Sequence, residues 1–177
     1  MHRDQALEMT LLREEEIPLY LETGRAAYRD HYCHLWPKGD PWPYLTRNFT
    51  EELVRSEIHN PELKVFMVRS GGMPAGICKL DLSREFGATA SGNSIFLEKI
   101  YFKRPFTGRG LGSSVIGEII RMGTQWGRDF LWLEAMQKGP ALSFYLNHGF
   151  SILGETEVPH PEVLESEKKM WVLGRKF

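Results

Sequence analysis

The chain has 177 residues, with 22 lysines and arginines against 23 aspartates and glutamates, and a formal net charge of −1. This length predicts one domain over residues 1–177, which can bury most of the unfolded chain's surface in a single core. Neither sign of charge is clustered, which argues against nucleic acid or a membrane as the main partner. The sequence has no apolar run of membrane-spanning length and no signal-peptide pattern. Its two cysteines, Cys33 and Cys78, lack the spacing of a disulfide framework, so we expect a cytoplasmic protein.

The first third of the chain predicts one strand and two helices. We expect a strand over 8–13, a helix over 17–32 and a loop over the Pro- and Trp-rich residues 34–45. Asn48 and Glu51 have the spacing of a capping box, which predicts a second helix over 49–59.

The remainder predicts a mixed sheet. Gly71-Gly72 separates two apolar runs and indicates a hairpin. An apolar stripe at spacings of four and three predicts a helix from Leu111 to Trp126. We expect strands over 63–70, 73–83, 95–103, 129–136, 150–158 and 168–177, a loop over 86–94, and a short helix between Pro140 and Gly149. This order of elements predicts an α/β or α+β domain with helices packed on a mixed sheet.

Three glycines stand on alternate positions at the junction of the strand over 95–103 and the next helix. Gly108, Gly110 and Gly112 surround Arg109 and precede the helix directly. Such a junction lets the backbone approach a ligand closely, and the unpaired N–H groups of the first helical turn suit a phosphate or pyrophosphate. A tight turn without a ligand remains the alternative. The spacing differs from a P-loop and from a dinucleotide fingerprint.

Two segments resemble the GNAT superfamily of N-acetyltransferases. The run "TGRGLGSSVIGEII" after "LEKIYF" resembles its acyl-CoA pyrophosphate loop, Gln/Arg-x-x-Gly-x-Gly/Ala, with Thr107 where Gln or Arg is usual. The run over 131–150 resembles the strand, helix and terminal Gly-Phe of the same family, although Lys138-Gly139 stands where the family has Asn. The matching positions of this run are Ala141, Phe144, Tyr145, Gly149 and Phe150. Within the family, the sequence is most similar to the bacterial polyamine-acetyltransferase-like branch.

The resemblance implies a mostly antiparallel sheet of about seven strands with about four helices. It implies transfer of an acetyl group from acetyl-CoA to the amine of a small molecule or peptide, with no metal, and it is compatible with a homodimer. The residues expected to bind the coenzyme are Ile100, Tyr101, Phe102, Thr107, Gly108, Arg109, Gly110, Leu111, Gly112, Ser113 and Lys138.

Two residues are candidates for proton transfer. A lysine-like amine has a pKa of about 10.4 and must lose a proton before it attacks a thioester. Some family members carry a carboxylate at the position of Phe96, and Glu98 follows two residues later on the same strand face, so Glu98 is the candidate base through water. Pairing with a lysine or arginine at a sheet edge is the alternative. Tyr145 matches the tyrosine that protonates the leaving thiolate in many relatives, and simple core packing is its alternative.

The aromatic residues of 28–45 are candidates for the acceptor pocket, because this region lines the pocket in relatives. We expect Tyr28, Tyr32 and Trp42 to contact the acceptor, although they could equally cover the core. His31, Cys33 and His34 lie close together, but no second ligand cluster accompanies them, so no metal site is expected. Two other functions remain open: a non-catalytic acyl-CoA-binding domain of this fold, and a module for another phosphorylated ligand.

Overall fold

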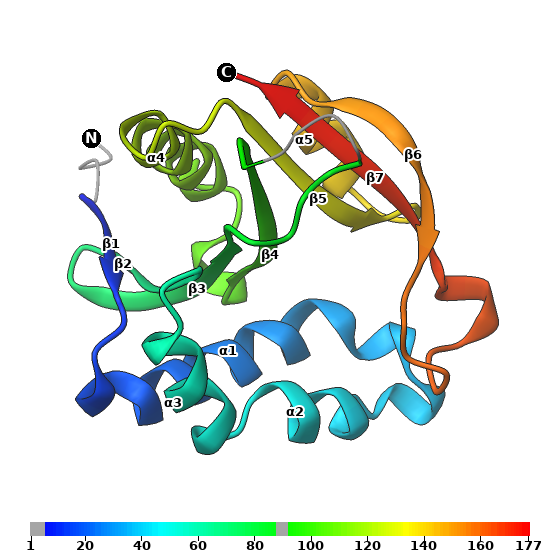
Figure 1. The fold of residues 1–177 in the computed structure, drawn as a ribbon. Coiled ribbons are helices and arrows are strands. Elements are labelled where there is room, and N and C mark those ends of the chain that lie inside the picture. Colours follow the sequence, from blue (N-terminus) through cyan, green and yellow to red (C-terminus); the bar gives the residue numbers. More distant parts are fainter. Residues whose placement is uncertain (1–5, 88–91) are drawn as a thin grey trace.

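The computed structural model describes residues 6–87 and 92–177, and its seven strands form one sheet (Figure 1). The strands are β1 (Leu7–Leu11), β2 (Leu63–Ser70), β3 (Met73–Asp81), β4 (Ser94–Phe102), β5 (Phe130–Met136), β6 (Ser151–Glu157) and β7 (Lys169–Lys176). Their order is β1-β2-β3-β4-β5-β7-β6. All neighbours are antiparallel except β4 and β5, which are parallel. The expected mixed, mostly antiparallel sheet of seven strands is confirmed.

Helices cover both faces of this sheet. The helices are α1 (Ile17–Tyr32), α2 (Trp42–Asn48), α3 (Glu51–His59), α4 (Leu111–Gln125) and α5 (Ala141–Asn147). Figure 1 shows α1, α2 and α3 together on one side of the sheet, with α4 on the other. We call the first side the α1 face and the second the α4 face; α5 packs in the same core as α4. No helix in the described part of the chain is both long and apolar enough to cross a membrane.

Strand β2 illustrates why the sheet has two cores. Its side chains alternate between the faces, as the pleat of a strand requires. Val65 and Met67 pack in the core under α1 and α3, whereas Phe66 and Val68 pack in the core under α4. The continuous apolar run of β2 is therefore buried on both sides.

The prediction of an uninterrupted loop over 34–45 is wrong. The segment forms two short 3₁₀ turns, Cys33–Leu35 and Pro37–Gly39, and then α2. The Asp40 carboxylate accepts a hydrogen bond of 3.0 Å from the Trp42 N–H and so starts the helix. Burial of Tyr44 and Leu45 against α1 stabilises it, and such tertiary packing outweighs the turn-forming composition of the segment.

The predicted capping box at Asn48 is also wrong. The Asn48 side chain donates to the Tyr44 carbonyl at the end of α2. The cap of α3 is Thr50, whose hydroxyl accepts from the Leu53 N–H at 3.2 Å. The helix therefore begins at Glu51. Of the predicted loop over 86–94, residues 88–91 lie outside the described residues.

A close helix contact generates a test of this packing. A Cβ atom on Gly24 in α1 would lie 2.3 Å from the Phe49 ring and 2.9 Å from Ile77. Because Phe49 and Ile77 are fully buried, we expect Gly24→Ala to lower the free energy of unfolding by about 1–3 kcal/mol through overpacking. Urea unfolding measures this change. The matched control is Gly117→Ala in α4, where the new methyl group meets nothing within 4 Å and should stabilise the helix by up to about 1 kcal/mol. Equal stability of Gly24→Ala and the parent would contradict the packing argument.

Candidate functional site

Strands β4 and β5 separate soon after they meet. They pair only over Ser94–Phe96 and Phe130–Trp132, and both strands then continue without pairing to each other. Figure 1 shows the sheet opening between them. We call this opening the fork. Because β4 pairs with β3 on its other side through Phe102, the β4 edge inside the fork keeps backbone groups that no strand of the described chain uses.

The backbone pattern identifies which residues of β4 face the fork. The Lys103 N–H bonds to the Ala75 carbonyl at 2.9 Å, so Lys103 faces β3. Antiparallel pairing alternates along a strand, so the backbone groups of Tyr101 also face β3, and those of Ile100 and Phe102 face the fork. The Phe102 carbonyl accepts from His31 Nε2 at 3.0 Å. Of the predicted strand contacts, Ile100 and Phe102 therefore offer backbone groups to a ligand, whereas Tyr101 offers its side chain to the α1 face.

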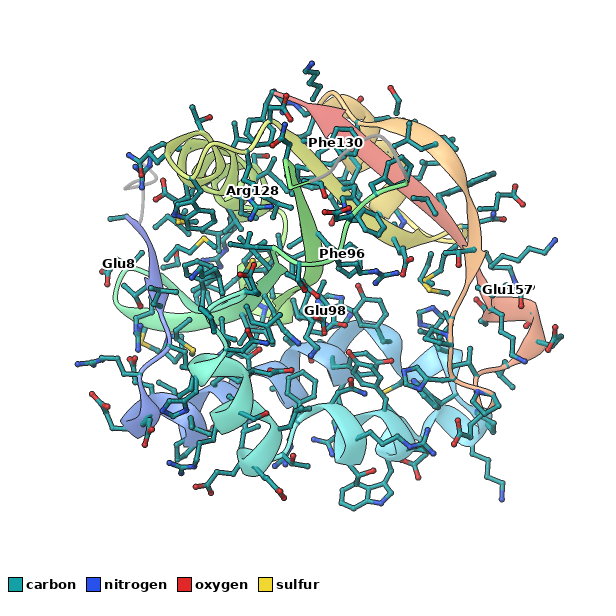
Figure 2. All side chains as sticks on the ribbon, viewed as in Figure 1. Glu8, Phe96, Glu98, Arg128, Phe130 and Glu157 are labelled. Carbon is teal, nitrogen blue, oxygen red and sulfur yellow. The ribbon has the colours of Figure 1, made fainter. Side chains whose placement is uncertain are left out.

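A β-bulge in β4 places two charged residues on one face. Lys79 is paired with Lys99 and Leu80 with Leu97, which leaves Glu98 as an extra residue in β4. Leu97 lies in the core under α4. The Glu98 and Lys99 side chains both point to the α1 face, where they approach each other at 3.3 Å. Figure 2 shows Glu98 between β4 and the layer of helices below the sheet.

The glycine loop leads into α4 as the sequence predicts. Gly108 and Gly110 have φ values of +71° and +79°, which side-chain-bearing residues rarely adopt. Gly110 precedes the first residue of α4, and no side chain caps the helix. Because the first hydrogen bond of the helix runs from the Ser114 N–H to the Gly110 carbonyl, the N–H groups of the first three residues remain available. The structure thus has an uncapped, positively polarised helix end at this loop.

The other predicted coenzyme residues take different positions around the loop. The Thr107 hydroxyl donates to the Arg104 carbonyl at 2.8 Å and holds the turn before the glycines. Arg109 is exposed, with its guanidinium carbon 6.0 Å from the Phe106 ring centre. Leu111 is buried, and the Ser113 hydroxyl bonds to His148. Lys138, in contrast, forms an exposed ion pair of 2.9 Å with Glu167.

Tyr145 lies on α5 with its side chain buried under the α4 face of the sheet. Its ring contacts Phe144 and Phe150 edge-on. Burial raises the pKa of the Tyr145 phenol far above its ordinary range, and the nearby Tyr32 and Cys78 raise this pKa further. The phenol is therefore protonated at neutral pH. Tyr32 comes from α1 on the opposite face of the sheet, and Tyr145 belongs to the core under the α4 face.

Glu98 belongs to a buried group of alternating charges. Lys79 Nζ lies 2.5 Å from a Glu57 carboxylate oxygen and 2.8 Å from a Glu98 oxygen. The side chains of Glu57, Lys79 and Lys99 are almost fully buried, whereas that of Glu98 is 30% exposed. Burial raises the Glu98 pKa, but Lys99 and Lys79 outweigh it, and the pKa is lowered overall. The ionised Glu98 is therefore the member of this group that solvent can reach.

Glu98 pairs with two lysines, as the pairing alternative expected, but in the middle of the sheet and not at its edge. Lys79 and Lys99 each interrupt an otherwise apolar strand, which is an unusual position for lysine and the one signal the sequence carried. The pairing of both lysines with Glu98 depends on the β3–β4 register, and that of Lys79 with Glu57 depends on the placement of α3. The sequence pattern specifies neither of these.

A cluster of tyrosines lies on the α1 face, beside the fork. Tyr28 and Tyr44 stack with ring centres 4.2 Å apart, and the Tyr44 and Tyr101 hydroxyls are 2.9 Å apart. Tyr28 is buried and accepts a hydrogen bond from Trp36, whereas Tyr32 is only partly buried and packs on Tyr28 and Tyr101. Trp42 lies outside this cluster and is 60% exposed. The structure therefore brings Tyr28 and Tyr32 together but not Trp42.

Where β4 and β5 still pair, at the closed end of the fork, the Arg84 guanidinium lies over two aromatic rings. The rings of Phe96 and Trp132 lie 4.4 Å apart, and the Arg84 guanidinium lies 3.9 Å from the Phe96 ring centre. Arg84 also pairs with Glu134 of β5 at 2.8 Å. The alternation of β5 places Trp132 and Glu134 on the α1 face, opposite to the core residue Leu133. Two carboxylates, Glu98 and Glu134, therefore face the same side of the fork.

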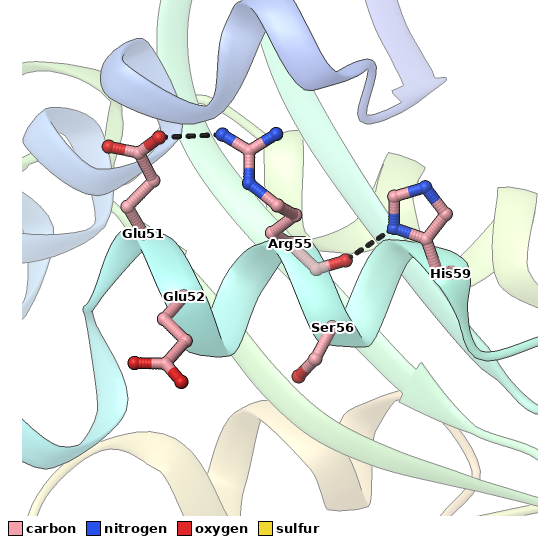
Figure 3. A pocket seen from close by; sticks show the side chains of 5 residues that line it. All are labelled: Glu51, Glu52, Arg55, Ser56 and His59. Atoms are coloured by element: carbon pink, nitrogen blue, oxygen red, sulfur yellow. Dashed lines mark hydrogen bonds and ion pairs between the residues drawn. The ribbon is translucent and has the colours of Figure 1, made fainter.

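The described residues contain no cluster of three histidines, cysteines, aspartates or glutamates that could hold a metal. His31 bonds to the Phe102 carbonyl and the Cys33 thiol to the Arg29 carbonyl. A separate surface hollow on α3 is lined by polar residues, among which Arg55 pairs with Glu51 (Figure 3). It includes none of the predicted site residues.

Comparison of this chain with known proteins identifies a matching family. The family model described as Acetyltransferase (GNAT) family matches residues 25–150. A curated relative is the "Uncharacterized N-acetyltransferase in pepI 3'region" of Lactobacillus delbrueckii subsp. lactis. It is 23% identical over 150 residues, which cover 84% of this chain and 87% of that protein.

Solved structures share the fold at low identity. The PaiA N-acetyltransferase from Thermoplasma acidophilum, in complex with coenzyme A, superimposes with a TM-score of 0.76 at 15% identity, covering 97% of this chain and 99% of that chain. The ribosomal-protein-S18-alanine N-acetyltransferase from Escherichia coli gives a TM-score of 0.68 at 16% identity, covering 97% and 94%. At these identities the likeness shows the fold.

The pairing of Glu98 predicts a pH-dependent contribution to stability. A carboxylate whose pKa is lowered on folding stabilises the protein above its unfolded pKa, about 4.3, and this contribution is lost as the pH falls through the folded value. We therefore expect Glu98→Gln to be less stable than the parent at pH 7, with the difference shrinking below about pH 4. Urea unfolding at several pH values measures it. The exposed Glu155→Gln on β6 is the control and should show no such trend. A constant difference for Glu98→Gln would contradict the assignment.

Proposed function

The chain belongs to the acetyltransferase (GNAT) family, and from that premise we propose that it transfers the acetyl group of acetyl-CoA to the amine of a small molecule or peptide. The observation that carries this proposal is the fork, which joins the glycine loop and the unpaired β4 edge to the carboxylates and tyrosines of the α1 face. The side with the glycine loop and the β4 edge suits an extended, phosphate-bearing donor. The side with the carboxylates and tyrosines of the α1 face suits a cationic acceptor.

The protein fits the coenzyme through its backbone. The first turn of α4 offers three N–H groups to the pyrophosphate, and Arg109 adds a positive charge from the loop. The fork-facing backbone groups of Ile100 and the N–H of Phe102, whose carbonyl already bonds to His31, pair with the pantetheine amides as a strand would. Acetyl-CoA supplies an activated thioester, and a backbone N–H of β4 stabilises the negative charge that develops on its carbonyl oxygen.

The acceptor side attracts and orients an amine. Glu98 and Glu134 are carboxylates on the α1 face, paired with Lys79 and Arg84, and Tyr32 is a partly buried tyrosine of the same face. Because its pKa is lowered, Glu98 is a weak base. The Glu98 carboxylate holds the ammonium group of the acceptor, and the ammonium proton passes to solvent through a water molecule. The neutral nitrogen then attacks the thioester carbon, and correct positioning supplies most of the rate. A polyamine, which carries several ammonium groups, is one acceptor that suits this side.

Tyr145 completes the reaction as the general acid. The bond between the carbonyl carbon and sulfur breaks, and the phenol gives its proton to the departing thiolate. No residue in the described part of the chain hydrogen-bonds to the Tyr145 hydroxyl, so its proton is free for this role. Tyr145 recovers a proton from solvent after the products leave.

The alternative is a domain of the same fold that binds acyl-CoA without catalysis, since Thr107 and Lys138-Gly139 depart from the family pattern. An acceptor screen with acetyl-CoA separates the two functions. It covers polyamines, amino acids, aminoglycosides and peptide N-termini, and a thiol reagent follows the release of CoA. Release with one class supports the enzyme. Coenzyme binding without release for any class supports the alternative, and absence of coenzyme binding contradicts both and favours a module for another phosphorylated ligand.

The charge at the start of α4 is tested by two substitutions at Gly110. Asp and Asn at this position have nearly the same shape and the same backbone strain, and either side chain can accept from the free N–H groups, but only the Asp carboxylate carries a negative charge that repels phosphates. We expect Gly110→Asp to bind acetyl-CoA at least about tenfold more weakly than Gly110→Asn, by calorimetry at low salt. Equal affinities would contradict an anion site here. Substitutions at Gly112 are less informative, because a Cβ there would lie 3.0 Å from the Phe144 ring.

Replacing Tyr145 by Phe removes the hydroxyl and keeps the packing of the ring. We expect kcat to fall by about a hundredfold, the lower end for general acid catalysis, because a thiolate is a fair leaving group. Since burial keeps the phenol protonated throughout an ordinary assay range, the loss should be the same at every pH. Acetyl-CoA affinity and Tm should stay close to those of the parent. An unchanged kcat would make Tyr145 a packing residue.

A further inference from the structure

The end of helix α5 contacts the first turn of α4 through two side chains. Phe144 lies in α5 and His148 directly follows the helix, and their ring centres are 4.3 Å apart. A Cβ on Gly112 would lie 3.0 Å from the Phe144 ring, and His148 Nε2 lies 2.7 Å from the Ser113 hydroxyl oxygen. Ser113 is the third residue of α4, so its N–H belongs to the free end of the helix. His148 therefore contacts the phosphate loop through one hydroxyl group.

The contact of His148 Nδ1 determines which ring nitrogen carries the hydrogen and which way the Ser113 hydroxyl points. Nδ1 lies 2.7 Å from the Phe144 carbonyl, which can only accept, so Nδ1 carries a hydrogen. In the neutral imidazole, Nε2 is then an acceptor, and the Ser113 hydroxyl must donate to it. In this state Ser113 presents only its lone pairs to the solvent. A phosphate oxygen next to Ser113 would meet another acceptor.

We propose that binding of the coenzyme phosphates is coupled to protonation of His148, so that the complex holds one more proton than the free protein. When the Ser113 hydroxyl turns to donate to a phosphate oxygen, Nε2 and Oγ would face each other as two acceptors at 2.7 Å. A proton taken from solvent by Nε2 restores their hydrogen bond with the direction reversed. It also places a positive charge next to the phosphates. The one bond formed is Nε2–H, with a proton that solvent or buffer gives up, and this proton returns to solvent when the ligand leaves.

The surroundings of His148 show which groups would compensate this charge. From β7, Arg175 donates to the His148 carbonyl at 2.7 Å. From α4 the contacting group is Ser113, and within α5 it is the Phe144 carbonyl. No carboxylate in the described part of the chain bonds to the imidazole. The negative charge that favours a protonated His148 is therefore that of the bound phosphates.

His148 is a positioning residue in this scheme, since it acts through Ser113, and the proposal rests on the proposed acetyl-CoA function. Proton uptake is measured by calorimetric titration with dephospho-CoA in buffers of different ionisation enthalpy at one pH. This probe keeps the pyrophosphate and lacks the 3′-phosphate, whose own protonation near pH 6 would confuse the result. For the parent we expect up to one proton taken up on binding, with affinity falling by up to about tenfold per pH unit as the pH rises.

Two substitutions should abolish the proton uptake on binding, and a third should leave it unchanged. His148→Gln and Ser113→Ala should bind dephospho-CoA more weakly at pH 6, with little or no proton uptake. His59→Gln, on α3, should keep the parent uptake. The parent titration needs no variant, so it stands even if a substitution disturbs folding. Binding without proton uptake by the parent, or equal uptake by His148→Gln, would overturn the coupling and leave the proposed function intact. Failure of the parent to bind either dephospho-CoA or CoA would overturn the proposed function itself.

Discussion

The separation of β4 from β5 after three residue pairs is the constraint on which the rest of this structure depends. A continuous sheet would keep its two faces apart and satisfy the backbone of both strands. Here β4 keeps its ladder with β3 while β5 pairs with β7, so the fork-facing backbone groups of Ile100 and the Phe102 N–H are paired with no strand of the described chain. Buried backbone groups without partners are costly, and a ligand that pairs with them recovers this cost.

The two strands of the fork carry side chains to both helical layers. Leu97 and Leu133 pack in the core under α4, whereas Glu98 and Glu134 lie on the α1 face. The bulge at Glu98 has a similar effect along β4, because one extra residue turns both Glu98 and Lys99 to the α1 face.

The buried charges of Glu57, Lys79, Glu98 and Lys99 are acceptable because two positive and two negative groups neutralise each other. A buried pair seldom adds net stability, but the loss of one partner leaves an uncompensated charge in the core. The arrangement keeps Glu98 ionised while leaving part of its carboxylate open to solvent. Relatives that share this fold at 15–16% identity show how few side chains the architecture needs, since the fork and the uncapped helix are backbone features.

The sequence by itself determined the sheet strands, four of the five helices, the hairpin at Gly71-Gly72 and the glycine loop before α4. These follow from local physics: side-chain periodicity, positive φ at glycine and the free N–H groups of a helix end. Helix α2 and the Thr50 cap were decided by tertiary structure, since burial of Tyr44 and Leu45 outweighs local composition. The lysines around Glu98 and the contact of His148 with Ser113 depend on strand register and on packing between residues distant in the chain. Periodicity predicts which face a side chain occupies, but only the folded arrangement decides which side chain it meets there.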